Sequence, residues 1–167
     1  MKKKLVYGIG SVVLIALFAF GYYTISPLFR HIKVDEQVPV VMSEAKTNPA
    51  GVTGTAGHSA SGTVSVLRGE KASYIRYENF KTVNGPDLYI YLANDLDAKD
   101  FVNLGTLKAT EGNVNYEIPA GVDVGKYRYV MVWCKRFGVL FNYADISVTS
   151  TAKGRDQESS ESGEAGK

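Results

Sequence analysis

The only cysteine and the only tryptophan of the chain are neighbours, Trp133 and Cys134, and the cations Lys135 and Arg136 follow them directly. A thiol that reaches the surface beside positive charges has a lowered pKa, and its thiolate is a nucleophile and a metal ligand. The position equally suits a small residue of the core, because free cysteine is among the most buried residue types. A redox role and a packing role in the core are therefore both possible interpretations of Cys134. A single cysteine excludes an internal disulfide and a thioredoxin-type dithiol.

Metal binding through Cys134 needs further ligands. A blue-copper centre uses two histidines and a cysteine, usually with a weak axial methionine. The predicted domain has one histidine, His58, and none follows Cys134, so blue copper is disfavoured and no metal site is predicted. His58 and Cys134 remain candidate cofactor-binding residues for a haem or a thiolate-bound metal, although their spacing requires neither. The alternative for His58 is an ordinary surface residue.

Other chemistries have little support in the sequence. The carboxylates lack the paired spacing of acid–base hydrolysis, and no Gly-x-Ser-x-Gly nucleophile motif is present. The net charge is +2, and no basic cluster in the folded region indicates nucleic acid as a partner. Hydrolysis and nucleic-acid binding therefore have no support in the sequence.

Residues 54–150 predict an all-β domain, an antiparallel β-sandwich of about seven to nine strands. Eleven tyrosines and seventeen glycines favour short strands and turns. Apolar and polar residues alternate with the period of a half-buried strand in several segments. We expect strands near residues 61–67, 72–80, 88–92, 102–109, 113–118, 126–135 and 139–149. We expect the segment 113–118 to pair with the segment 102–109 across Glu111-Gly112. Residues 84–87 are expected to form a turn in which Gly85 supplies the unusual φ.

Alternation also predicts where the thiol faces. Cys134 shares its parity with Val130 and Val132, whereas Trp133 shares it with Met131 and Lys135. If the valines face the core, the thiol points inward.

The segments outside this domain differ in composition. Residues 1–4 hold three lysines, and residues 5–26 are uncharged and long enough for a transmembrane helix. The charge bias predicts a single-pass cell-membrane protein with a cytoplasmic N-terminus and an extracytoplasmic domain. A cleaved signal peptide is the competing interpretation. Residues 27–53 predict a stalk or linker, and residues 151–167 a disordered polar tail.

Several motifs of the predicted domain occur together and in a fixed order. They are His58-x-x-x-Gly62, Asn79-Phe80, Asn84-Gly85-Pro86-Asp87-Leu88-Tyr89-Ile90-Tyr91-Leu92, Leu104-Gly105-x-Leu107-Lys108, Gly112, Tyr116-x-Ile118-Pro119, Trp133-Cys134-Lys135-x-Phe137 and Phe141-x-x-Ala144. This set resembles the DM13 domain over about residues 54–146.

The resemblance implies a β-rich extracytoplasmic domain with a role in electron transfer or redox chemistry. In that family the cysteine of the Trp-Cys motif is the proposed redox centre, and here it is Cys134. Related proteins often join this domain to DOMON and cytochrome modules, which are not seen in this sequence. The resemblance therefore implies a separate redox partner protein, and an electron-transfer or binding module more than a stand-alone enzyme. The alternative function is a non-catalytic module that binds a ligand or protein through its loops, with Cys134 as core packing.

Overall fold

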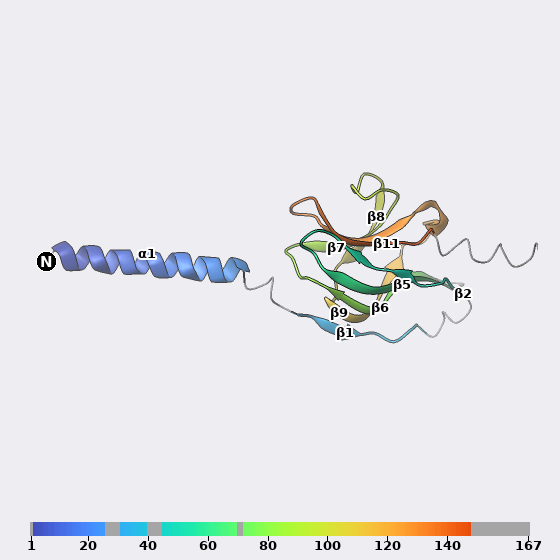
Figure 1. Ribbon diagram of the computed structural model, residues 1–167, viewed down its shortest axis with the longest axis horizontal. Coiled ribbons are helices and arrows are strands. Elements are labelled where there is room, and N and C mark those ends of the chain that lie inside the picture. The colour runs from blue at the N-terminus through green and yellow to red at the C-terminus, as the bar shows by residue number, and fades with distance from the viewer. Residues whose placement is uncertain (1, 26–30, 40–44, 70–71, 148–167) are drawn as a thin grey trace, which may run out of the picture.

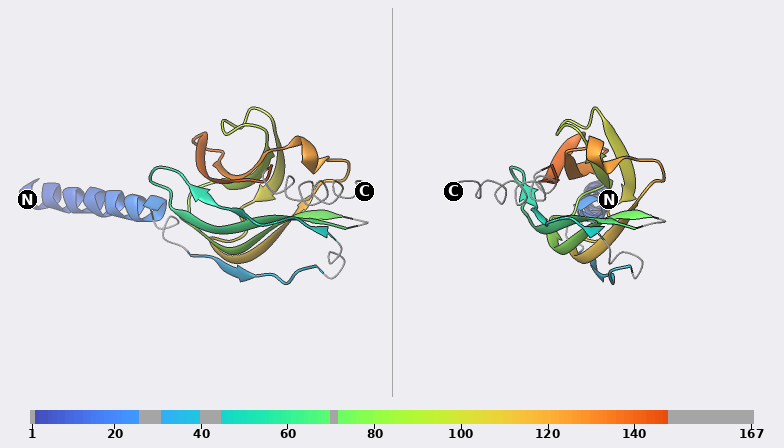
Figure 2. Two further views of the ribbon diagram at one scale, coloured as in Figure 1. Left: turned by 45° about the vertical axis from the view of Figure 1, so that its right-hand side comes forward. Right: turned by 90° about the vertical axis from the view of Figure 1, so that its right-hand side faces the viewer.

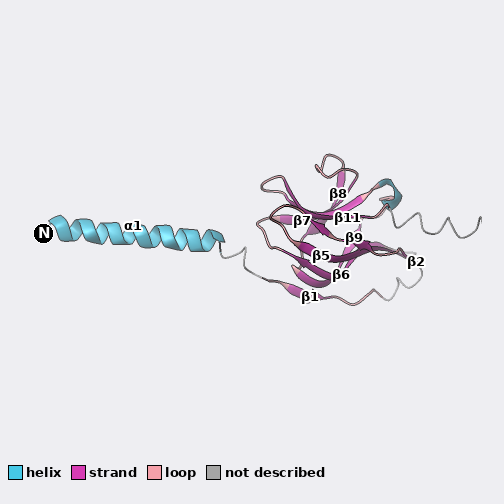
Figure 3. Cartoon of the chain, viewed as in Figure 1, coloured by secondary structure: helices cyan, strands magenta, loops and turns pink. Residues whose placement is uncertain are grey.

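The structure is a computed structural model that describes residues 2–25, 31–39, 45–69 and 72–147. These residues form one α-helix, α1 (Lys2–Ile25), one short 3₁₀ helix, η3 (Val124–Lys126), and eleven strands. The strands belong to two sheets, which lie in separate layers in Figures 1 and 3. Figure 2 shows the orange-red β11 on the opposite side of the domain from the green strands β5 and β6.

The first sheet has the strand order β1-β9-β6-β5-β2, and β3 also pairs with β5. Its long strands are β5 (Ala60–Arg68), β6 (Ser73–Thr82) and β9 (Glu111–Ile118), which pair antiparallel. Its short strands are β1 (Lys33–Asp35), β2 (Ala45–Lys46) and β3 (Ala50–Gly51). The short strand β1 runs parallel to β9.

The second sheet has the strand order β4-β11-β10-β7-β8, and all its pairs are antiparallel. It consists of β4 (Thr53–Gly54), β7 (Leu88–Ala93), β8 (Phe101–Thr106), β10 (Tyr129–Cys134) and β11 (Val139–Asp145). The strand that carries the thiol, β10, is thus central, with β7 on one side and β11 on the other.

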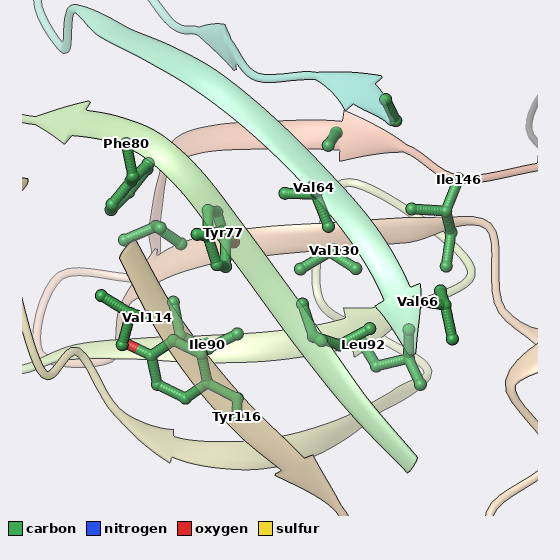
Figure 4. Packing of buried hydrophobic residues seen from close by; sticks show 14 of the residues in the cluster. Val64, Val66, Tyr77, Phe80, Ile90, Leu92, Val114, Tyr116, Val130 and Ile146 are labelled. Atoms are coloured by element: carbon green, nitrogen blue, oxygen red, sulfur yellow. The ribbon is translucent and has the colours of Figure 1, made fainter. Parts of the chain in front are cut away.

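A single large apolar core fills the space between the sheets. The alternating residues Val64 and Val66 of β5 meet Ile90 and Leu92 of β7, together with Val130 of β10 (Figure 4). Burying one such side chain stabilises the fold by about 1.5–3 kcal/mol. The period-two pattern of the sequence therefore predicted the inward faces of these strands correctly.

The predicted β-sandwich is confirmed in outline, with three differences. The described residues form eleven strands instead of seven to nine, because short segments of two or three residues add to the seven long ones. The β1–β9 pair is parallel, so the first sheet is mixed. The expected pairing of residues 102–109 with 113–118 is wrong: β8 pairs with β7 in one sheet and β9 with β6 in the other. Both segments turn apolar residues to the same core, and alternation alone cannot tell which sheet each joins.

Part of the predicted stalk, residues 27–53, lies on the first sheet as β1, β2 and β3. The buried Arg76 guanidinium donates to the backbone oxygen of Glu36 (3.0 Å) and to Asn115 Oδ1 (2.9 Å). The Asn115 backbone N–H donates to Glu36 Oε2 at 2.7 Å. These bonds attach the described residues 31–39 to the outer face of the sheet, so this part of the segment does more than space the domain.

The predicted transmembrane segment, residues 5–26, falls mostly within α1, and apolar side chains such as Val12, Leu14 and Phe18 are exposed there. Among the residues that the structure describes, no helix combines the length and hydropathy that a membrane span requires. The transmembrane prediction is therefore not supported. The predicted polar tail, residues 151–167, lies outside the described residues.

Candidate functional site

Cys134 is the last residue of β10 and lies opposite Leu88 of β7 and Val139 of β11. Its side chain is fully buried and belongs to the core cluster that also contains Val130 and Val132. The predicted inward orientation of the thiol is therefore confirmed. Trp133 and Met131 face the other way, into a smaller cluster on the outer face of the sheet.

The loop of residues 84–87 lies directly against the thiol. Cys134 Sγ–H donates a hydrogen bond to the carbonyl oxygen of Pro86 at 3.1 Å. The next residue, Lys135, donates its backbone N–H to the carbonyl oxygen of Asp87 at 3.0 Å, which holds the loop to the end of β10. A buried thiol thus has a hydrogen-bond partner, and that partner belongs to a loop and not to a core strand.

The conformation of this loop differs from the prediction at one residue. The left-handed φ, +69°, belongs to Asp87 and not to Gly85. Aspartate tolerates this region better than most residues. Gly85 has a different role: a Cβ atom there would lie 2.8 Å from Phe141 Cζ, so the absent side chain lets the loop pack against the Phe141 ring.

His58 packs against the same ring. The imidazole of His58, half-buried, stacks on Phe141 with ring centroids 3.9 Å apart. Its Nδ1 lies 3.2 Å from Thr55 Oγ1, and that hydroxyl also donates to the Leu140 carbonyl oxygen at 2.8 Å. His58 is therefore half-buried and packed against Phe141.

Phe141 connects the two candidate residues that the sequence singled out. It touches His58 on one face and the loop 84–87 at Gly85, and the same loop bonds Cys134 through Pro86. The structure shows no direct hydrogen bond between His58 and Cys134 in the described part of the chain. Sequence reasoning gave Phe141 no role. The β10–β11 pairing shifts register between Val132 and Trp133, so that Phe141 has no partner residue in β10, and this shift cannot be seen in the residue pattern.

Of the two cations that follow the thiol, Lys135 lies on the opposite face of the sheet. Lys135 and Arg136 are exposed. The Lys135 ammonium lies over the ring of Tyr89, 5.4 Å from its centroid, and Tyr89 belongs to the outer cluster of the sheet. The thiol faces the opposite side of the same sheet.

The donor groups do not fit a haem or a metal ion held by His58 and Cys134 together in this arrangement. The thiol is enclosed by apolar residues and bonded to Pro86, while the imidazole is stacked on Phe141 and bonded to Thr55. Within the described residues, no group of three or more His, Cys, Asp or Glu side chains is placed to hold a metal ion. A ligand role for the pair would need both sets of contacts to break.

The comparisons with known proteins agree with the motifs of the sequence. Neither the curated proteins nor the solved structures gave a match. A family model described as Electron transfer DM13 matches residues 53–146, which include the loop 84–87, His58, Cys134 and Phe141. Since this match covers more than half of the chain, the chain belongs to the DM13 family.

Proposed function

We propose that this DM13 domain has a redox role in which Cys134 is the reacting group, and that the loop 84–87 controls access to it. The family description supports a redox role. The observation that carries the assignment to Cys134 is its hydrogen bond to Pro86, because it places the one thiol of the chain directly beneath a loop. Loops open locally at lower free energy than core strands do.

Opening of the loop changes the surroundings of the sulfur in two ways. It removes the Pro86 acceptor and the Lys135–Asp87 backbone bond, and it admits water to the end of β10. Lys135 and Arg136 are the next two residues, and positive charge beside a hydrated thiol favours the thiolate. The closed form would protect the thiol, and the open form would let it react with an oxidant or a redox partner protein.

Spectroscopy and thiol titration of the purified full chain test this proposal. We expect one thiol per chain to react with an alkylating reagent under native conditions, more slowly than in denaturant, and no reaction in Cys134→Ala. The absorption spectrum and the metal content of the same sample show whether a cofactor accompanies the thiol. A colourless, metal-free protein whose native thiol resists both alkylation and oxidation would contradict the redox role.

One observation favours a second candidate, a non-catalytic binding module. Cys134 has no exposed surface and packs with Val130 and Val132, as a core cysteine does. Ligand contacts would then come from loops such as residues 81–87 and 95–100. A Cys134→Ala chain that folds and keeps its biological activity would support this candidate. Loss of activity at unchanged stability would support the redox role.

We also propose that the domain lies outside the cytoplasm and that α1 attaches it to a membrane. The support is the run of exposed apolar side chains on α1 behind three lysines. Alkaline extraction of membranes and protease digestion of intact cells test this location. Release of the chain by alkali, or protection of the domain from external protease, would contradict it.

A further inference from the structure

A cavity of about 240 Å³ opens at the end of the domain opposite the thiol. Its lining comes from β5, from η3 and from the segments that flank β2, β7, β10 and β11: Thr47, Val66, Arg68, Asn94, Val124, Gly125, Lys126, Tyr127, Arg128, Ile146 and Ser147. Arg128 directly precedes β10, and Cys134 ends it. At about 3.3 Å per strand residue, the two ends lie roughly 20 Å apart. The cavity is therefore separate from the candidate redox site.

The inner wall of this cavity is apolar. Val66 of β5, Val124 of η3 and Ile146, which follows β11, are all buried residues of the core cluster that line the cavity. Figure 4 shows Val66 and Ile146 at the same end of that cluster. A ligand group that enters here meets hydrocarbon, which favours an apolar body.

The rim of the cavity is cationic. Arg68, Lys126 and Arg128 are exposed residues of the lining. Arg128 is already paired, since its Nε and Nη2 donate to Asp145 Oδ2 at 3.0 and 2.8 Å. Among the described residues, no carboxylate lies within 4.0 Å of the Arg68 or Lys126 side chain. Two cations on the rim thus have positive charge that an anion can neutralise.

We propose that this cavity binds a small organic carboxylate, with its apolar chain against Val66, Val124 and Ile146 and its carboxylate between Arg68 and Lys126. The volume is below the roughly 300–1,000 Å³ of sites for drug-sized ligands, so the ligand is short. The apolar wall disfavours a bare inorganic anion, and the rim disfavours an amine. The proposal does not depend on the redox role of Cys134.

Titration of the full chain with hexanoate, followed by backbone amide NMR, tests the proposal. We expect saturable shifts at Gly125, Lys126 and Ser147, which line the cavity, and weaker binding of acetate, hexanamide and hexylamine. Arg68→Gln and Lys126→Gln should each weaken hexanoate binding by about threefold to tenfold. Lys81→Gln, which removes an exposed lysine of β6 outside the cavity, should leave it unchanged.

Four results would overturn the proposal. Hexanamide that binds as well as hexanoate would show that the rim cations do not recognise charge. Acetate that binds equally well would remove the role of the apolar wall. Absence of saturable shifts at the lining residues, or equal loss of affinity in all three glutamine variants, would show that the cavity is not the binding site. Because the substituted side chains are exposed, thermal unfolding of each variant should match the native chain.

Discussion

Phe141→Leu should raise the rate at which Cys134 is modified, because it loosens the loop 84–87 that covers the thiol. The Phe141 ring packs against Gly85 in the loop 84–87 and against the His58 imidazole. Leucine keeps an apolar side chain in the core but loses both ring contacts. The loop that covers the thiol should therefore open more often, while the sheets stay paired.

The magnitude follows from burial and ring packing. Phe141 is 7 % exposed, so its truncation is a core substitution. Replacing it by leucine should cost about 1–2 kcal/mol in global stability, and the lost ring pair contributes about 0.5–1.5 kcal/mol of this total. If this loss of 1–2 kcal/mol shifts the equilibrium of the loop from its closed to its open form, the open population rises about fivefold to thirtyfold.

The assay combines urea unfolding with the rate of thiol modification in native buffer. Ile118→Val is the matched control, because it trims a buried residue of β9, at a cost of about 0.5–1.5 kcal/mol, without touching the loop 84–87. The control should lower the urea midpoint but leave the thiol rate nearly unchanged, because the loop 84–87 keeps all its contacts. If the thiol rate in Ile118→Val rises as far as its loss of global stability requires, the thiol is reached by complete unfolding and the gating role of the loop is wrong.

Three further predictions concern the fold. Gly62→Ala should cost about 2–4 kcal/mol in urea unfolding, because φ is +113° there and a Cβ would lie 2.8 Å from Asn79 O and Phe80 Cα. Gly51→Ala should be nearly neutral, because a Cβ there has no atom within 4 Å. Arg76→Leu should lower the free energy of unfolding by about 2–4 kcal/mol and speed hydrogen exchange at Glu36 and Asn115, since their oxygens lose a buried donor. Arg128→Ala removes an exposed ion pair and should cost less than about 1 kcal/mol. Equal losses of stability in the two variants would contradict the attachment of residues 31–39. A hydrogen bond from Lys46, together with one from Arg76, holds the pKa of Glu78 below its ordinary value against the opposing effect of desolvation. The folded chain then binds fewer protons than the unfolded one, so this contribution is present above the unfolded pKa, about 4.3, and is lost as pH falls through the folded pKa. Glu78→Gln should flatten the fall of the urea midpoint below about pH 4, and an unchanged slope would show that the pair does not stabilise the fold.

Parts of the fold that depend on local pattern could be predicted from the sequence. Alternation placed Val130, Val132 and Cys134 on the inward face of β10, and their burial confirms it. Strand pairing depends on contacts between distant segments, so the partners of β8 and β9 were predicted wrongly. The short strands β1–β3 were not predicted, because segments of two or three residues are too short to show the period-two alternation of a strand.

The candidate site was predicted only as separate residues. The motifs singled out His58, Cys134 and the turn at residues 84–87, and the family match includes all of them. Their arrangement follows from tertiary contacts: the Phe141 ring fits against Gly85 only because that residue lacks a side chain. The positive φ belongs to Asp87, whereas the rule that assigns a positive φ to glycine placed it at Gly85. The inward thiol was predictable, but its hydrogen bond to Pro86 was not.

The most direct test of the redox assignment is the intact mass of the native chain after treatment with hydrogen peroxide. In this reaction the thiolate sulfur attacks one peroxide oxygen, the O–O bond breaks with release of hydroxide, and sulfenic acid forms, which thiols reduce. We expect one added oxygen at Cys134 at a rate faster than global unfolding, complete reversal by dithiothreitol, and no addition at that position in Cys134→Ala. A native chain whose Cys134 stays unmodified while the urea-unfolded chain is oxidised would contradict the account and leave Cys134 as a core residue.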